Sequence, residues 1–342
     1  MKKGLRGMKR IAGAALWLLV FVSGLLALNH ALLRDDSARK YSAFYEEKQD
    51  FDVFFLGTSH VIDAIYPIDL WRDYGIASYN FGNTAETPEA TYWTLRLALG
   101  KHTPKAVVMD VCYIDRVQEE DGIVAFGHTF MDAVPLSAEK MRAVWSLYGE
   151  GDRAEFVFPF VTHHARWEEI LTGADVDTVD SLPCMFGAEL RAGRSEPAPF
   201  VRTQEMDLTE SKGKQAVREI IALCRERGIE LVLTAIPFPA DETMQRAMNS
   251  AQAIAEECGV PFLNLFEVEG LVDFETDCYD PMSHLNPDGA AKVTAYLGAW
   301  LDEHFDFTDK RTDPRYAHWN EALAEYERIY EECWSEMSLL KE

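Results

Sequence analysis

The chain has 342 residues, of which 48% are hydrophobic and 12% aromatic, so it is long and apolar enough to build a substantial core, and its composition argues against a disordered or collagen-like protein. Its formal net charge is −24 at pH 7. This charge argues against a nucleic-acid partner, because binding to phosphates requires clustered basic side chains.

Residues 1–34 are predicted to form a short cytoplasmic stub and a membrane anchor. Residues 11–33 carry no formal charge, and at about 1.5 Å per residue such a helix spans the roughly 30 Å core of a bilayer. Five basic residues and no acid precede this stretch: Lys2, Lys3, Arg6, Lys9 and Arg10. The positive-inside rule therefore predicts a single-pass cell-membrane protein with a cytoplasmic N-terminus and an extracytoplasmic body. The alternative is a cleaved signal peptide, although no good small-x-small site follows the apolar stretch.

After a linker or short helix at residues 35–50, apolar strands alternate with amphipathic helices up to about residue 308. Strands are predicted at residues 52–57, 77–82, 106–111, 230–236 and 260–266. Helices are predicted at residues 87–99, 209–227, 241–258 and 287–301. Continuous apolar strands that alternate with helices are typical of a parallel sheet covered on both faces. With right-handed crossovers, residues 51–308 are expected to form a doubly wound α/β domain, a flavodoxin-like three-layer sandwich.

Two further segments interrupt or follow this alternation. Residues 113–205, approximately, are predicted to be a long insertion that caps the edge of the sheet, because a structureless loop of this length is unusual. Residues 309–342 are predicted to form a C-terminal helix that packs on the body. The six cysteines include no C-x-x-C pair, so we expect neither a zinc ribbon nor a redox motif. An extracytoplasmic location would permit disulfides, whereas the positions of Cys224 and Cys258 on helical apolar faces favour buried thiols, so the disulfide state stays open.

Ser59 follows the first predicted strand, at the end of the sheet where ligands bind in doubly wound folds. A serine that caps a turn is the simpler interpretation, and the absence of a G-x-S-x-G motif excludes the α/β-hydrolase elbow. His284 lies on a loop just before a predicted helix, with Asp280 four residues upstream. A nucleophilic serine requires a base, and the base requires an orienting group, so this loop can supply both. The alternative for His284 is a surface histidine in a helix-entry turn.

Three short blocks, in this order along the chain, resemble those of the SGNH/GDSL hydrolases. They are Gly57-Thr58-Ser59-His60, Asn80-Phe81-Gly82-Asn83, and Asp280 with His284. The resemblance covers roughly residues 51–301 apart from the insertion. It is greatest to the membrane-anchored branch, which is similar to the D-alanine transfer protein of teichoic-acid modification and to alginate O-acetylation proteins. The resemblance implies Ser59 as the nucleophile, His284 as its base, Asp280 as the third member, Gly82 as an oxyanion-hole amide, and no cofactor.

The chain departs from the family pattern in three places. The first block has Thr58 where the family usually has aspartate. The third block of the family, G-x-N-D, is replaced here by Met109-Asp110-Val111, which makes Asn83 the candidate for the missing oxyanion donor. The acid, Asp280, lies four rather than three residues before the histidine.

The insertion contains a cluster with His164, Arg166 and Trp167, and the anchored relatives have a similar stretch. The resemblance implies a cap over the cleft, with Arg166 binding a carboxylate or phosphate and Trp167 stacking on a sugar. The alternative is the start of an aromatic helix that packs on the sheet. Metal binding by His163 with His164, or by His60 with Asp63, lacks a supporting motif, so no metal is predicted.

The sequence therefore favours an extracytoplasmic serine acyl-ester hydrolase or O-acyltransferase that acts on a cell-envelope polymer or its acyl donor. A membrane-bound O-acyltransferase is a candidate partner. One alternative is a non-catalytic SGNH-like protein that binds a glycan or recruits that acyltransferase. Another is a purely structural envelope protein.

Overall fold

The computed structural model describes residues 2–33, 35–117, 120–172, 182–282 and 284–339. Its centre is a five-stranded, entirely parallel sheet in the order β2-β1-β3-β4-β5. The strands are β1 (Val53–Gly57), β2 (Ser78–Gly82), β3 (Ala106–Asp110), β4 (Glu230–Ala235) and β5 (Phe262–Asn264). β1 to β3 are buried along their whole length, as expected for a sheet covered on both faces. The predicted doubly wound α/β fold is confirmed.

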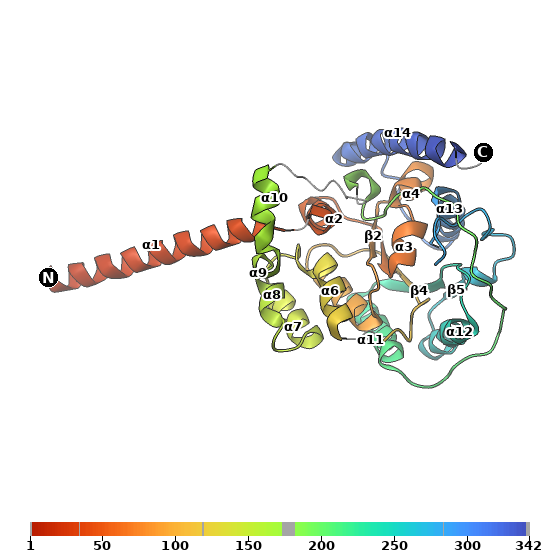
Figure 1. The fold of residues 1–342 in the computed structure, drawn as a ribbon, viewed down its shortest axis with the longest axis horizontal. Coiled ribbons are helices and arrows are strands. Elements are labelled where there is room, and N and C mark those ends of the chain that lie inside the picture. Colours follow the sequence, from red (N-terminus) through yellow and green to blue (C-terminus); the bar gives the residue numbers. More distant parts are fainter. Residues whose placement is uncertain (1, 34, 118–119, 173–181, 283, 340–342) are drawn as a thin grey trace.

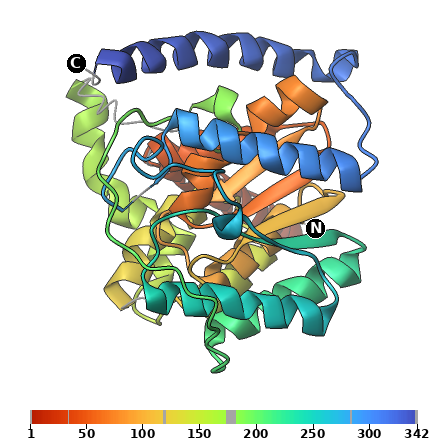
Figure 2. The same ribbon diagram turned by 90° about the vertical axis from the view of Figure 1, so that its right-hand side faces the viewer.

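Helices cover both faces of the sheet (Figures 1 and 2). One layer consists of α5 (Pro88–Ala98), α11 (Lys212–Arg227) and α12 (Glu242–Cys258). The other consists of α3 (Ser59–Ala64), α4 (Pro67–Tyr74) and α13 (Pro287–His304). Local signals fix the helix starts: Thr87 caps α5, and the Asn286 side chain accepts from the first amides of α13. This arrangement is a three-layer sandwich.

The segment at residues 35–50 is part of the body. Most of it forms α2 (Asp35–Glu46), and the side chains of Tyr41 and Phe44 are buried. The Phe44 ring lies 4.8 Å from that of Phe81 and 5.7 Å from that of Phe54, in edge-on contacts. These aromatic contacts bury α2 against the β1 and β2 side of the sheet.

The insertion after β3 is mostly helical. Its elements are α6 (Glu120–Met131), α7 (Ala138–Leu147), α8 (Arg153–Val157), α9 (Phe160–His163), η1 (His164–Arg166), α10 (Trp167–Thr172) and η2 (Pro183–Met185). Residues 173–181 of the predicted insertion lie outside the described residues. The Asn80 amide of β2 donates to the Phe186 carbonyl at 2.9 Å, so the turn after η2 covers this edge strand. At the next residue, Gly187, φ is +91° and a Cβ would overlap the Asn80 carbonyl oxygen.

The chain ends in η4 (Pro314–Tyr316) and α14 (Ala317–Leu339), which lies across the α4 and α13 side of the body (Figure 2). The fully buried Trp319 stacks on Phe186 with 3.6 Å between ring centroids, and the Tyr326 hydroxyl donates to Asp69. These contacts join the C-terminal helix to both the sandwich and the insertion.

At the other end, α1 (Lys2–Ala31) projects away from the body (Figure 1). Within its segment Met8–Ala31, the most apolar stretch of 18 residues has a mean hydropathy of 2.4 and is not buried by the rest of the chain. The helix is therefore long and apolar enough to cross a membrane.

Candidate active site

Ser59 lies at the sharp turn between β1 and α3. The backbone at Gly57 has φ +149°, and a Cβ there would lie 2.6 Å from Val61 Cγ2 and 2.9 Å from Asp110 Cβ. Glycine is therefore required for the chain to turn this closely. Ser59 is partly exposed, whereas its neighbour His60 is buried. The serine is therefore accessible to solvent next to a buried residue of the same helix.

A tight hairpin before α13 holds the other two predicted residues. The Tyr279 amide donates to the His284 carbonyl at 3.0 Å, and the Asn286 amide donates to the Asp277 carbonyl at 2.8 Å. Cys278 and Leu285 form an antiparallel bridge between these bonds. Asp280 and His284 consequently occupy the end of a short, hydrogen-bonded loop.

The structure brings Ser59, His284 and Asp280 into one hydrogen-bonded chain. Ser59 Oγ lies 2.7 Å from His284 Nε2, and His284 Nδ1 lies 2.7 Å from Asp280 Oδ2. The other carboxylate oxygen of Asp280 accepts from the His284 amide at 3.0 Å. A carboxylate at Nδ1 favours the tautomer with hydrogen on that nitrogen, which leaves Nε2 free to accept from the serine. The four-residue spacing of Asp280 and His284 is therefore compatible with this contact.

His60, next to the serine, is a further neighbour of the site; the sequence placed it only in the first block and, with Asp63, among metal ligands that lack a supporting motif. Its ring centroid lies 4.7 Å from that of His284 and 4.5 Å from that of Phe238. Burial lowers the pKa of His60 well below its usual value, and positive charge at His284 and Arg116 lowers this pKa further. His60 is thus a neutral, packed ring that supports His284 from one side.

Tyr279, one residue before Asp280, contacts His284 as well. The two rings are stacked with their centroids 5.8 Å apart, and the Tyr279 hydroxyl donates to Asp63 of α3 at 3.0 Å. This hydrogen bond ties the hairpin to the helix that begins at Ser59. No sequence signal predicted that His60 and Tyr279 would pack against His284, because aromatic packing depends on the fold.

Gly82 ends β2 beside α3. A Cβ at Gly82 would lie 2.7 Å from the Ile62 nitrogen and 2.8 Å from the Thr58 carbonyl oxygen, so α3 can approach β2 only because this residue is glycine. The Gly82 amide donates to the Asn80 side-chain oxygen at 2.8 Å. The Asn80 side-chain nitrogen in turn donates to the carbonyls of Val61 and Ile65, which makes Asn80 a buried link between β2 and α3.

Asn83, the other predicted oxyanion donor, is also hydrogen-bonded within the protein. Its amide donates to the Gly57 carbonyl at 3.1 Å, and its side-chain nitrogen donates to Phe81 and Glu86. Ser59 differs from both donors: it is the first residue of α3, so its own amide has no carbonyl partner within that helix. The backbone amide of Ser59 therefore remains for an oxyanion.

Asp110 is the last residue of β3, in the place where the SGNH/GDSL hydrolases usually have the G-x-N-D block with its asparagine. Its Oδ1 accepts from the Ile236 amide at 3.0 Å, and within the described part of the chain Oδ2 has no hydrogen-bond partner. Burial raises the pKa of Asp110 to about 6. The strand end next to the serine turn therefore holds a carboxyl group that takes up a proton more readily than a free aspartate.

His164 and Arg166 belong to η1, and Trp167 is the first residue of α10. α9 and α10 lie beside the end of α1 (Figure 1). The Arg166 guanidinium donates to the Leu32 carbonyl at 3.4 Å and to the Leu33 carbonyl, just beyond the end of α1. His164 is exposed, with Nδ1 2.8 Å from the Val161 carbonyl, and Trp167 is half exposed. Arg166 thus contacts the segment directly after α1, and a substrate-binding role for the three residues stays a prediction.

A cavity of about 610 Å³ opens beside the carboxyl ends of β2 and β3. Its lining includes Ala85, Arg116, Ile123, Phe126, Phe130 and Tyr148. The Arg116 guanidinium lies over the Tyr113 ring at 5.0 Å, and the Tyr113 ring lies 5.3 Å from that of His60. The surface of the cavity is mainly apolar, although charged residues also line it: Glu86, Glu89, Asp115, Arg116 and Lys212. Its lining in the described part of the chain does not include Ser59 or His284, and Arg116 connects it to His60 through Tyr113.

Comparisons with known proteins found similarity in structure only. No family model matches the sequence, and no curated protein matches it significantly. A lipolytic protein of the G-D-S-L family from Desulfitobacterium hafniense overlaps 73% of this chain and 99% of its own, with 10% identity and a TM-score of 0.36. A GDSL-like lipase from Bacteroides thetaiotaomicron (12% identity) and an acylhydrolase from Bacteroides fragilis (11% identity) each overlap 79% of this chain and 98% of their own, with TM-scores of 0.39.

Identities of 10–12% and TM-scores of 0.36–0.39 support no conclusion about activity, which rests on the side chains themselves. The parallel sheet, with Ser59 and Gly82 at adjacent strand ends and Asp280 and His284 before the last core helix, reproduces the SGNH/GDSL order. The side chains implied by the SGNH/GDSL resemblance therefore lie together in a parallel, doubly wound α/β fold.

Proposed function

We propose that this protein is a serine-dependent acyl-ester hydrolase or O-acyltransferase. The observation that carries the proposal is the chain of two 2.7 Å contacts from Ser59 through His284 to Asp280. A serine is a weak nucleophile until an adjacent base removes its proton, and a base on one side with an acid behind it is the arrangement that activates serine on many unrelated folds.

The reaction begins when Ser59 Oγ bonds to the acyl carbonyl carbon and its proton passes to His284 Nε2. Asp280 stabilises the resulting imidazolium through Nδ1. The carbonyl becomes a tetrahedral oxyanion beside the Ser59 amide, and one such donor contributes about 3 kcal/mol to lowering the barrier. The bond from carbon to the leaving oxygen then breaks, the leaving group takes the proton from His284, and an acyl-serine remains.

The second half returns the enzyme to its first state. Water or a second hydroxyl loses its proton to His284 and attacks the acyl-serine carbon; Ser59 leaves and regains the proton. Attack by water gives hydrolysis, and attack by a sugar hydroxyl gives transfer. The mainly apolar cavity at the ends of β2 and β3 supports an acyl chain or a sugar face as the bound group. Arg116 lines this cavity and contacts Tyr113, which lies next to His60, so Arg116 is a candidate contact for an anionic substituent.

We further propose that α1 anchors the enzyme with its body outside the cytoplasm. The basic residues before the apolar helix support this orientation. An active site held at the extracytoplasmic face of the membrane acts on a cell-envelope polymer or on an acyl donor within the membrane. A membrane-bound O-acyltransferase is a partner that would supply such a donor.

One observation favours a second candidate, a non-catalytic protein that binds a glycan or recruits the acyltransferase. The amides of Gly82 and Asn83 are both hydrogen-bonded inside the protein, which leaves the oxyanion fewer donors than the family pattern implies. A weak oxyanion site reduces catalysis without affecting binding.

A fluorophosphonate probe separates the two candidates. The full-length protein in detergent should be labelled, and the modified residue should be Ser59, whereas Ser59→Ala should remain unlabelled at equal thermal stability. Incubation with acetyl, D-alanyl and longer acyl esters, followed by mass spectrometry, should then add one acyl group to the Ser59 peptide. Folded wild-type protein that takes up neither probe nor acyl group would support the binding candidate instead.

A further inference from the structure

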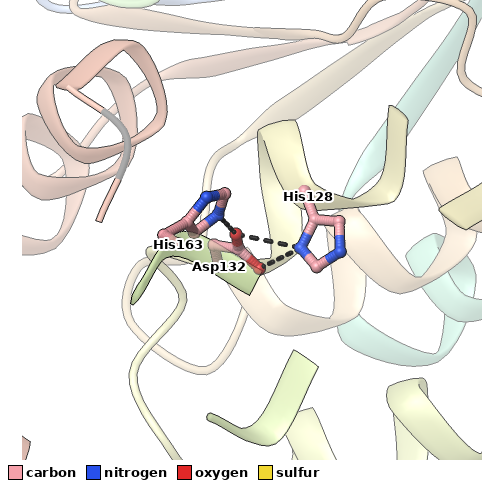
Figure 3. A group of neighbouring side chains, drawn as sticks. All are labelled: His128, Asp132 and His163. Carbon is pink, nitrogen blue, oxygen red and sulfur yellow. Dashed lines mark hydrogen bonds and ion pairs between the residues drawn. The ribbon is translucent and has the colours of Figure 1, made fainter. Parts of the chain in front are cut away.

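The insertion contains a buried group of side chains that the proposed reaction does not use. His128 lies in the last turn of α6, Asp132 follows directly after that helix, and His163 is the last residue of α9 (Figure 3). Their exposed fractions are 5%, 3% and 9%. His128 and Asp132 are four residues apart and so lie on one face of the same helical turn, whereas His163 reaches them from a different helix.

Two imidazole nitrogens converge on one carboxylate. His128 Nδ1 lies 2.9 Å from Asp132 Oδ1 and 3.0 Å from Oδ2, and His163 Nε2 lies 2.7 Å from the same Oδ2. One ligand atom from each residue can be chosen so that all three lie within 4.8 Å of one another. In a tetrahedral zinc site, bonds of about 2.0–2.1 Å set neighbouring ligand atoms roughly 3.3 Å apart. To fit an ion, the two imidazole–carboxylate contacts would have to lengthen by roughly half an ångström.

The far nitrogen of His128 meets a second carboxylate. His128 Nε2 lies 3.5 Å from Glu155 Oε2 in α8. An imidazole that binds a metal through Nδ1 carries its hydrogen on Nε2, and metal-bound histidines commonly donate that hydrogen to a carboxylate. The His128 ring also stacks on Phe156 with 4.3 Å between centroids, which fixes its plane. The surroundings of His128 thus match the outer shell of a metal-binding histidine.

From these contacts we propose that His128, Asp132 and His163 bind one divalent ion of the Zn²⁺ class, with water as the remaining ligand. Two imidazoles and a carboxylate suit zinc and its first-row neighbours, whereas Mg²⁺ and Ca²⁺ prefer oxygen ligands throughout. The sequence predicted no metal because the ligands fall in two separate segments that match no known spacing. The site is independent of the proposed ester chemistry.

The ion would join α6, at the beginning of the insertion, to α9, the helix of the insertion that contacts α1. α9 begins at Phe160, whose amide donates to the Asn29 side-chain oxygen of α1 at 3.0 Å. Because His163 is in the same short helix, a metal at this site fixes α9 to α6 and thereby fixes the base of α1 against the body. We expect a stabilising rather than a catalytic metal.

The test measures metal content rather than activity. Full-length, untagged protein in detergent is stripped with a chelator, dialysed against Zn²⁺ and analysed for bound zinc after removal of the free ion. We expect one zinc per chain in the wild type and its loss in His163→Ala and in Asp132→Asn. His164→Ala is the matched control: this exposed neighbour of His163 lies outside the cluster, so the variant should keep the zinc.

Two further measurements keep the test decisive if a ligand variant folds poorly. Glu155→Gln should retain one zinc per chain but bind it about 10–100-fold more weakly, since it removes only the outer contact of His128. Added Zn²⁺ should raise the melting temperature of stripped wild-type protein, because binding to the folded state alone stabilises it by mass action. A wild type that binds no more zinc than His163→Ala, or whose melting temperature does not respond to Zn²⁺, would overturn the proposal and leave the cluster a hydrogen-bonded link.

Discussion

Ser59 Oγ and His284 Nε2 lie 2.7 Å apart although 225 positions separate the two residues in the chain. Packing between α3 and α13 makes this contact possible. The buried Thr294 hydroxyl of α13 donates to the Ala64 carbonyl at 3.2 Å and accepts from the Tyr66 amide at 3.0 Å, directly after α3. The helix that follows the histidine is thus fixed to the helix that carries the serine, and this sets the distance between their side chains.

The first prediction concerns Asp280. Replacing it by asparagine keeps the shape but removes the charge that holds His284 in the tautomer with Nδ1 protonated. We expect kcat for ester cleavage to fall on the order of 10³–10⁴-fold with little change in stability. Asp288→Asn, in the first turn of α13, is the control and should keep at least most of the rate. An Asp280→Asn enzyme as fast as wild type would show that His284 needs no carboxylate.

A second prediction concerns the close approach at Gly82. Gly82→Ala introduces a Cβ that overlaps the backbone of Thr58 and Ile62 and so displaces the turn that carries Ser59. We expect a loss of about 1–3 kcal/mol in the free energy of unfolding and much slower fluorophosphonate labelling. Gly151→Ala, where a Cβ meets nothing within 4 Å, should change neither quantity. Equal labelling rates in the two variants would contradict the prediction.

A third prediction follows from Asp110, whose pKa burial raises from 3.8 to about 6. Because the folded state binds this proton more tightly than the unfolded state, the group's stabilising contribution is complete below about pH 4 and is lost as the pH rises through 6. The loss amounts to about 3 kcal/mol. Asp110→Asn stays neutral and keeps the acceptor for Ile236, so it should be more stable than wild type at pH 8 and similar at pH 4. Chemical denaturation at pH 4 and pH 8 measures the free energy of unfolding of both proteins. If the variant and the wild type differ by the same amount at the two pH values, the prediction is wrong.

A fourth prediction tests how the C-terminal helix is held. Trp319 is fully buried, with its ring stacked on Phe186 and 5.1 Å from that of Trp71. Trp319→Ala should lower the free energy of unfolding by about 3–5 kcal/mol, because it leaves a large cavity. The half-exposed Trp167 provides the comparison, and Trp167→Ala should cost less than about 0.5 kcal/mol. Similar losses in both variants would mean that α14 is not packed as described.

The fifth prediction concerns α1. The full-length protein should remain in the membrane fraction after a high-salt or alkaline wash, because the apolar helix is held by the bilayer rather than by charge. A chain that begins at Leu32 should fold and move to the soluble fraction. Amino-terminal sequencing of the membrane form should find residues 1–31 still attached. Their removal in cells would identify a cleaved signal peptide instead.

Local patterns in the sequence were sufficient for the five strands and for helices α5, α11, α12 and α13, but they did not predict α3, α4 or the individual helices of the insertion. The apolar strands, the Thr87 and Asn286 caps and the α12 and α13 limits agree within a few residues, because periodicity and capping depend on neighbours in the chain. The parallel sheet and the placement of Ser59 at a strand end follow from that alternation. The apolar stretch of α1 was equally visible, since spanning length and the absence of charge are properties of one continuous segment.

Only the tertiary structure decided which side chains meet. It gave His284 a carboxylate partner across a four-residue spacing, paired the amides of Gly82 and Asn83 within the protein, and set Arg166 against the end of α1. It also joined His128 and Asp132 to His163. Such contacts depend on how helices far apart in sequence pack and on distances of a few tenths of an ångström, which no local pattern of residues contains.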